Sequence, residues 1–299
     1  MWPDGEPARL GLAVSGGGDS LALLLLAAAA LPGRVEAASV DHGLRAGSAD
    51  EAALVARVCQ TLVVPHATLA VRVAAGNVQD RARAARYAAL GEWCARRGLA
   101  ALATGHQLDD QAETLAMRLN RGSGLAGLAG VRARGVVPGT ALPLLRPLLG
   151  WRRAELAEVV AAAGIAPAND PSNADAHFDR VRVRQALAQT DWLDPAGLAR
   201  SAALLGEAEG YLARSIDAAW ERRVVRAGGA LRFAPGPSDF EACEIARRIV
   251  EGFGGTARRS DVAALVARLR RGENASLGGV LAKGAGGDWL FTREPPRGA

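Results

Sequence analysis

The sequence predicts an α/β protein in which a doubly wound, mostly parallel sheet is followed by a smaller, mainly helical C-terminal domain. From Leu10 to Arg121, short apolar segments alternate with longer helical ones, and this alternation favours a parallel sheet with helices on both faces. Further along, helical patterns dominate. With 299 residues, 49% of them hydrophobic, the chain can form two cores, which we expect at residues 1–190 and 191–299.

The predicted sheet has its strands in short apolar segments and its helices in the longer segments between them. The strands are expected at Leu10–Val14, Val35–Val40, His66–Val71 and Leu99–Thr104. The helices are expected at Asp19–Ala30, Ser48–Val63, Val78–Arg97 and Asp109–Asn120. Ligands of such sheets bind beyond the carboxyl ends of the strands, so the residues that follow each strand are the first candidates for a site.

The rest of the chain is expected to be mostly helical. Helices are predicted at Trp151–Ala163, over Asp194–Arg226 as one long helix or two in tandem, and at Ser238–Phe253 and Ser260–Arg270. A stretch containing glycine and proline, Gly228–Pro237, interrupts them. A hairpin of Ala275–Leu281 and Trp289–Arg293 is expected near the end, and it completes the helical domain.

A glycine-rich loop joins the first strand to the first helix. Its residues are Ser15, Gly16, Gly17, Gly18, Asp19 and Ser20. Glycines allow close backbone approach, and the start of a helix attracts anions, so we predict a phosphate-binding loop. A Walker loop is excluded because no lysine follows the last glycine, and a dinucleotide loop because Leu21 occupies the third glycine position. A carboxylate at Asp19 fits if Mg²⁺ bridges it to phosphate; the alternative is a glycine-rich turn without a ligand.

Acidic residues gather at the start of the predicted helix that follows His106. Asp109 and Glu113 share one helix face and Asp110 lies beside them. Acids in a first helical turn often only complement the helix dipole. At the same sheet edge as Asp19 they could instead act in catalysis, by holding Mg²⁺ on a triphosphate, for which we favour Asp19 and Asp109, or by binding the ammonium group of an amine. His42 and His106 also end strands and are expected to face the nucleotide, although a lone histidine is more often a satisfied core residue.

Arginines supply nearly all of the positive charge, and the net charge is +5. Arg121 and Arg146 are the pair expected to stabilise charge on the α-phosphate and on departing pyrophosphate. Two further groups are expected to bind an RNA backbone, although solvated helix faces are an equal alternative. They are Arg81, Arg83 and Arg86 beside Tyr87, and Arg180, Arg182 and Arg184.

Several classes of protein are excluded by composition. No apolar run is long enough to span a bilayer, and the first residues lack the basic region of a secretion signal, so we expect no membrane association. The three cysteines form no C-x-x-C pair, which argues against a disulfide framework or a zinc site and favours a cytoplasmic location. The oligomeric state is left open, and a homodimer is compatible with the sequence.

The order of the motifs resembles that of the tRNA(Ile)-lysidine synthetase family, within the N-type ATP pyrophosphatases (PP-loop superfamily), over about residues 8–190. The motifs are S-G-G-G-D-S, V-D-H-G-L-R, N-V-Q-D-R-A-R-A-A-R-Y, G-H-Q-L-D-D-Q-A-E-T, R-G-S-G-L-A-G-L-A-G, R-P-L-L, D-P-S-N and F-D-R-V-R-V-R. The tail from Leu277 to Glu294 resembles the end of shorter family members more loosely.

The resemblance implies a reaction with ATP and Mg²⁺. The wobble cytidine of a CAU-anticodon isoleucine tRNA is adenylated at its C2 oxygen with release of pyrophosphate. The ε-amine of free L-lysine then attacks C2 and displaces AMP, which gives lysidine. The chain departs from the family at Gln107, where a second histidine is often found, and it is expected to lack the final domain of longer members.

Two other functions remain open from the residues. The first is a sister ATP pyrophosphatase that modifies tRNA or forms an amide, although tRNA thiolases need paired cysteines that this chain lacks. The second is a non-catalytic RNA-binding relative. The acid cluster argues against this second function, because a protein that only binds polyanions gains nothing from clustered carboxylates.

Overall fold

The computed structural model describes residues 8–41, 48–71, 78–168, 179–285 and 287–294, and the chain divides into two compact units, Met1–Glu207 and Ala208–Ala299. The expected division at residues 190 and 191 precedes α8, which begins in the first unit at Pro195 and ends in the second at Arg223. Each unit has its own hydrophobic core.

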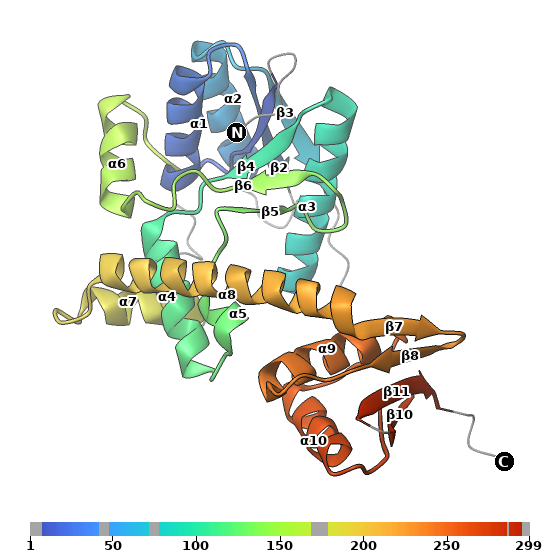
Figure 1. Cartoon of the computed structure of the whole chain (residues 1–299). Helices are drawn as coiled ribbons and strands as arrows, with labels where there is room; N and C mark the ends of the chain where they lie inside the picture. Colours follow the sequence, from blue (N-terminus) through green and yellow to red (C-terminus); the bar gives the residue numbers. More distant parts are fainter. Residues whose placement is uncertain (1–7, 42–47, 72–77, 169–178, 286, 295–299) are drawn as a thin grey trace. The chain divides into compact units, whose positions relative to one another are not determined.

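The first unit contains a six-stranded sheet in the order β3-β2-β1-β4-β6-β5 (Figure 1). Only β5 and β6 pair antiparallel. The strands are β1 (Leu10–Ala13), β2 (Val35–Asp41), β3 (His66–Ala70), β4 (Ala101–Thr104), β5 (Arg134–Val136) and β6 (Pro143–Leu145). The helices that begin in this unit are α1 (Gly18–Ala30), α2 (Ser48–Thr61), α3 (Val78–Arg97), α4 (Leu108–Asn120), α5 (Leu125–Leu128), α6 (Arg153–Ala162), α7 (Asp179–Ala188) and α8 (Pro195–Arg223). The predicted doubly wound parallel sheet is confirmed.

Helices cover both faces of this sheet. One core joins β1 and β2 to α1, α2 and α6, and a second core joins the other face to α3 through Leu90, Trp93 and Cys94. Figure 1 shows α1, α2 and α6 on one face and α3 on the opposite one. Helix α1 is apolar nearly all round, as expected for a buried helix, and its residues Leu21 to Leu24 are at most 1% exposed.

The strand order reverses between β1 and β4, and the register there positions the site. Ala13 pairs with Thr104, the last residue of each strand, so the loops that follow β1 and β4 leave the sheet side by side. A reversal of this kind creates a crevice in which α/β proteins bind ligands. The topology therefore brings the glycine-rich loop next to the start of α4.

The second unit contains a five-stranded antiparallel sheet in the order β7-β8-β11-β10-β9, packed on two helices. Its elements are β7 (Val224–Ala227), β8 (Ala230–Phe233), α9 (Asp239–Gly252), α10 (Arg259–Arg270), β9 (Ala275–Leu277), β10 (Val280–Ala285) and β11 (Asp288–Arg293). The expected hairpin is part of this larger sheet. The helix prediction over Val224–Arg226 was wrong, because these residues pair with β8.

Among the described residues, no helix combines the length and the apolar character needed to cross a lipid bilayer.

Candidate active site

The loop between β1 and α1 has the geometry of an anion-binding site. Gly17 is the N-cap of α1 and supplies no side-chain cap, so the first amides of the helix are left for a ligand. The Ser20 hydroxyl donates to the Gly17 carbonyl at 2.9 Å and accepts from the Ser15 amide at 3.1 Å, which closes the loop on itself. Gly16 has a φ of 87°, a conformation that favours glycine.

Gly105 brings the start of α4 against this loop. A Cβ on Gly105 would lie 2.8 Å from the Asp19 carbonyl oxygen and 3.1 Å from the Ser20 nitrogen, so no larger residue fits without movement. Gln107 then caps α4: its side-chain oxygen accepts from the Asp109 amide at 2.5 Å, and the Gln107 amide donates to Asp110 at 3.1 Å. The acids of α4 are thereby held at the glycine-rich loop.

Asp19 and Asp110 form the centre of the site. Burial raises the pKa of Asp19, Arg153 counteracts this, and the negative charge of Asp110 raises it further. Burial also raises the pKa of Asp110, against the attraction of Arg180. The charge of Asp110 thus disfavours ionisation of Asp19, and burial disfavours ionisation of both carboxyl groups.

Asp109 lies in a different environment, although the sequence analysis paired it with Asp19. One of its oxygens accepts from the Arg153 amide at 2.8 Å and the other lies 3.1 Å from the Arg152 guanidinium. Arg152 and Arg153 are the N-cap and first residue of α6. Asp109 therefore binds the start of α6, and the carboxylate that the structure brings to Asp19 is Asp110.

Glu113 is almost completely buried, with 1% of its surface exposed, and three arginines surround it. Arg180 Nε donates at 2.9 Å, Arg184 Nε at 2.7 Å and Arg153 Nη2 at 3.1 Å. Burial by itself would raise the pKa of Glu113, but the hydrogen bond from Arg184 and the charge of Arg153 outweigh burial and hold this pKa below its usual value. Two of the arginines predicted to bind RNA, Arg180 and Arg184, therefore have their guanidinium groups on Glu113.

Arg153 was not predicted as a site residue, and it contacts every acid of the cluster. Besides Glu113, its guanidinium lies 3.7 Å from Asp110 and 3.9 Å from Asp19, and its amide binds Asp109. A signal was present: two arginines stand at the start of α6, where the helix dipole disfavours cations. Consecutive cations at such a place indicate acidic partners from elsewhere in the fold.

The Gln107 side chain supplies a donor that the protein leaves unused. Gln107 is fully buried, and within the described part of the chain its Nε2 has no hydrogen-bond partner. The amide lies near enough to Asp19 to lower the pKa of that carboxyl. A buried donor without a partner costs free energy, so this one indicates a ligand with acceptor atoms.

Basic side chains gather around Tyr87 on α3, next to His106. The guanidinium carbons of Arg83 and Arg86 lie 5.1 and 5.5 Å from the Tyr87 ring centroid. Burial, with a contribution from Arg83, lowers the pKa of both Arg86 and Arg146. Burial and the charges of Arg146 and Arg180 lower the pKa of His106 to about 3, so its imidazole is neutral at neutral pH. Clustered cations that disfavour one another are suited to binding an anion.

Arg121 lies apart from this cluster, so the structure does not bring Arg121 and Arg146 together. It is the C-cap of α4, at the opposite end from the acids, and it binds Asp179 at 2.8 Å. Arg182 also pairs with Asp179 and keeps a largely exposed side chain. Arg81 is exposed on α3, whereas His42 lies outside the described residues.

The residues of this site fit Mg²⁺ only if the ion also binds the phosphates of a ligand. No group of three or more histidine, cysteine or acidic residues able to hold a metal is found among the residues that the structure describes. Magnesium commonly takes only one or two protein carboxylates and completes its shell with phosphates and water. Asp19 and Asp110, beside an anion-binding loop, meet that requirement.

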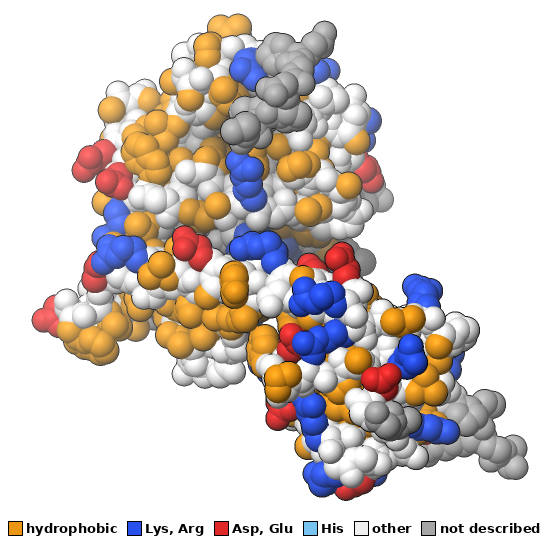
Figure 2. Space-filling model, in the orientation of Figure 1, with side chains coloured by type: hydrophobic (Ala, Val, Ile, Leu, Met, Phe, Trp, Pro, Cys, Tyr) orange, Lys and Arg blue, Asp and Glu red, His pale blue; other side chains and the backbone are white. Residues whose placement is uncertain are grey.

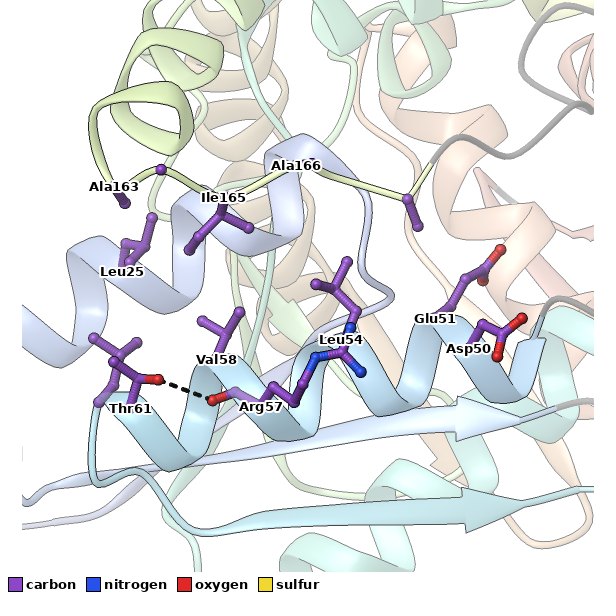
Figure 3. A pocket seen from close by; sticks show the side chains of 13 residues that line it. Leu25, Asp50, Glu51, Leu54, Arg57, Val58, Thr61, Ala163, Ile165 and Ala166 are labelled. Atoms are coloured by element: carbon purple, nitrogen blue, oxygen red, sulfur yellow. Dashed lines mark hydrogen bonds between the residues drawn. The ribbon is translucent and has the colours of Figure 1, made fainter.

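A separate cavity of about 710 Å³ lies on the face of the sheet that α1 and α2 cover (Figure 3). Leu25, Leu54, Val58 and Ile165 point toward it, and Asp50 and Glu51 stand at one end. It adjoins the glycine-rich loop, since the Ala168 amide donates to the Gly16 carbonyl at 3.0 Å. Among the described residues, none of those predicted for the site lines this cavity.

Comparison with known proteins places this site in context. Residues 3–191 match the model of the PP-loop domain. A protein of Novosphingobium aromaticivorans named tRNA(Ile)-lysidine synthase is 48% identical, covering 98% of this chain and 92% of the relative. Proteins of the same name from Zymomonas mobilis and Ruegeria pomeroyi are 40% and 44% identical, over 97% and 96% of this chain and 89% and 72% of theirs.

Among solved structures, the U34-tRNA thiolase NcsA from Methanococcus maripaludis has a similar fold. The TM-score is 0.56 at 17% identity, covering 68% of this chain and 71% of the thiolase. This likeness concerns the fold alone.

Proposed function

Since the chain belongs to the tRNA(Ile)-lysidine synthase family of PP-loop proteins, we propose that it uses ATP to form lysidine on tRNA(Ile) at the site between β1 and α4. The observation that carries this proposal is the placement of Asp19 and Asp110 directly beside an uncapped helix start. That arrangement suits a nucleoside triphosphate with its magnesium ion.

The glycine-rich loop is assigned to the phosphates of ATP. The amides at the start of α1 face the anion, and Ser15 and Ser20 hold the loop in shape. Asp19 and Asp110 are the residues that would hold Mg²⁺, which supplies charge neutralisation on the phosphates when bound. The free donor of Gln107 is available to an acceptor oxygen of the ligand.

The reaction has two steps, as the family implies. The C2 oxygen of the wobble cytidine attacks the α-phosphorus of ATP, the bond to the bridging oxygen breaks, and pyrophosphate leaves. The lysine ε-amine, as the neutral base, then attacks C2; the C2–O bond breaks, AMP leaves and a proton is lost from the nitrogen. Negative charge grows on phosphate oxygens in the first step, and we assign its stabilisation to Arg146 with Arg83 and Arg86, which have no carboxylate partner among the described residues.

Contacts to the tRNA are assigned to exposed cations on both units. Arg81 on α3 and Arg182 on α7 are exposed in the first unit. We also assign tRNA binding to the C-terminal part, residues 191–299. The second unit holds 15 lysine and arginine residues against 11 acidic ones, whereas the first is nearly balanced at 21 against 20. A tRNA substrate and three unpaired cysteines favour a cytoplasmic location.

Pyrophosphate release tests the function. We would incubate the protein with ATP, with and without L-lysine, on CAU-anticodon isoleucine tRNA and on elongator methionine tRNA with the same anticodon. Release that requires the isoleucine tRNA, with labelled lysine recovered in it, is expected. Release driven by another acceptor would assign the chain to a sister activity.

A matched variant tests the site. Asp19→Asn keeps the size of the side chain and removes its charge, and we expect pyrophosphate release to fall at least 100-fold. Asp50→Asn, on α2 and beside the separate cavity, removes a similar charge away from the acids. Equal activity in Asp19→Asn and wild type would refute the assigned metal role.

A further inference from the structure

The acid cluster carries as many cations as carboxylates, which is unexpected for a site that binds only a cation. Asp19, Asp110 and Glu113 face Arg153, Arg180 and Arg184 within ion-pair or electrostatic reach. A ligand with one positive and one negative group would match such a surface better than a simple amine.

The three arginines differ in how many of their donors are used. Arg184 directs Nε and Nη2 to Glu113, and Arg180 directs Nε to Glu113 and Nη2 to Thr114. Arg153 makes one side-chain hydrogen bond within the described part of the chain, from Nη2 to Glu113. A guanidinium has five N–H donors, so most of those on Arg153 remain available beside Asp19 and Asp110.

Arg153 is also held firmly at its backbone. Its amide binds Asp109 at 2.8 Å and it opens α6, which packs on α1. About a third of its side chain is exposed (33%), so a ligand can reach the guanidinium. The unused Nε2 of buried Gln107 points independently to a ligand with acceptor atoms at this place.

We infer that Arg153 binds the α-carboxylate of the free amino acid substrate. The inference rests on the proposed function, in which that amino acid is L-lysine. A guanidinium and a carboxylate form paired, charge-assisted hydrogen bonds, and binding the α-carboxylate leaves the ε-amine free to react. Arg153 thereby selects a free amino acid over a diamine or a lysine within a peptide.

The test compares L-lysine with cadaverine, which has the same chain and lacks the carboxylate. Lysidine or its decarboxylated analogue would be measured on isoleucine tRNA by mass spectrometry, for wild type and Arg153→Ala. We expect Arg153→Ala to lower kcat/KM for lysine about 10- to 100-fold, mainly through KM, and to change the value for cadaverine less than about threefold. Arg153→Lys should restore part of the loss with lysine.

Arg184→Ala is the matched control, because it removes a guanidinium that binds Glu113 through both Nε and Nη2, so it should affect both amines alike. Equal losses with lysine and cadaverine in Arg153→Ala would overturn the inference and leave Arg153 a structural residue. If Arg153→Ala has no measurable activity, the affinity of the protein for each amine would be measured by calorimetry instead. An unchanged affinity for lysine in Arg153→Ala would overturn the inference. Absence of lysidine with the wild-type protein would instead refute the proposed function.

Discussion

Asp110 and Glu113 lie one turn apart on α4, yet their surroundings shift their pKa values in opposite directions. Glu113 accepts hydrogen bonds from three arginines, whereas Asp110 lies 3.7 Å from each of Arg153 and Arg180 and close to Asp19. Residue type and helical spacing do not distinguish them. At this scale, the side chains that come from α6 and α7 decide which acid is structural and which is free for a ligand.

Asp110→Asn is expected to stabilise the substrate-free protein. In the folded state the pKa of Asp110 lies above its ordinary value, so its ionised form opposes folding at neutral pH and this penalty disappears as pH falls through the folded pKa. We expect the free energy of unfolding, measured with urea at pH 7, to rise by about 1 kcal/mol. The enzymatic activity should be lost. The gain should shrink toward pH 4; an Asp110→Asn variant less stable than wild type would contradict this.

Glu113→Gln is expected to do the reverse. The folded pKa of Glu113 lies below its ordinary value of 4.5, so its contribution is present above that value and is lost as pH falls through the folded pKa. We expect the free energy of unfolding to fall by about 2 kcal/mol at pH 7. The partly exposed arginines make this loss smaller than for fully buried ion pairs. The difference from wild type should narrow in acid, and a pH-independent difference would argue against the ion pairs as its cause.

At the scale of elements, the ends of helices and strands are where sequence patterns and structure differ. Helix α2 was expected to continue to Val63 and ends at Thr61. Val63 has a φ of 55° and is 88% exposed, which is unfavourable for a β-branched residue and allows the Val64 amide to donate to the Cys59 carbonyl. The hydrogen bond that ends the helix therefore determines the backbone conformation of Val63.

Val63→Gly should therefore stabilise the protein. Glycine adopts the left-handed conformation without strain, and an exposed valine gives up little packing. We expect the free energy of unfolding to rise by about 0.5–1 kcal/mol, measured as a shift in the denaturant midpoint. Val71→Gly, at the end of the segment that includes β3, supplies a control without positive φ and should not stabilise; equal gains at both positions would contradict the argument.

Gly105→Ala tests the contact between the β4–α4 connection and α1. The added methyl group would meet backbone atoms of Asp19 and Ser20, which cannot rotate away. We expect a loss of about 1–3 kcal/mol and a fall in pyrophosphate release of about 100-fold, because the acids move relative to the loop. Gly150→Ala, where a Cβ would meet no atom within 4 Å, should leave both the stability and the rate of pyrophosphate release unchanged.

At the scale of the whole molecule, positive charge is distributed unevenly over the chain. The excess of 15 basic over 11 acidic residues in the second unit accounts for most of the net charge of +5. Figure 2 shows basic side chains spread over this unit, with acidic ones between them. A cavity of about 470 Å³ in the second unit is lined by Trp220, Phe253, Arg226 and Arg248, and no carboxylate is found among the described residues that line it.

Replacing Trp220 and Arg226 together by alanine should weaken tRNA binding. Arg248 stacks 4.4 Å from the Trp220 ring centroid, so a base has both an aromatic and a cationic surface to contact. We expect KM for tRNA to rise about tenfold and the salt dependence of binding to become shallower. Arg258→Ala removes an exposed cation outside the cavity; if it has the same effect, only overall charge matters.

Local sequence patterns predicted the glycine-rich loop, most helices of the first unit and the parallel strands that place Asp19 near α4. These depend on local properties: apolar periodicity, glycine content and the positions of polar residues after strands. It also correctly indicated the chemistry of ATP, because a glycine-rich loop with an acid is a local pattern. The assigned roles of individual site residues stay predictions, as does a homodimer.

The partners of those residues follow from contacts between distant parts of the folded chain. Val224–Arg226 reads as helix and forms β7 because β8 and β11 offer it a sheet edge. Asp109 binds α6, Glu113 binds three arginines, and Asp110 is left beside Asp19. Charges and strand partners pair across many residues of sequence, and the free energy of each pairing depends on burial and geometry that no local pattern contains.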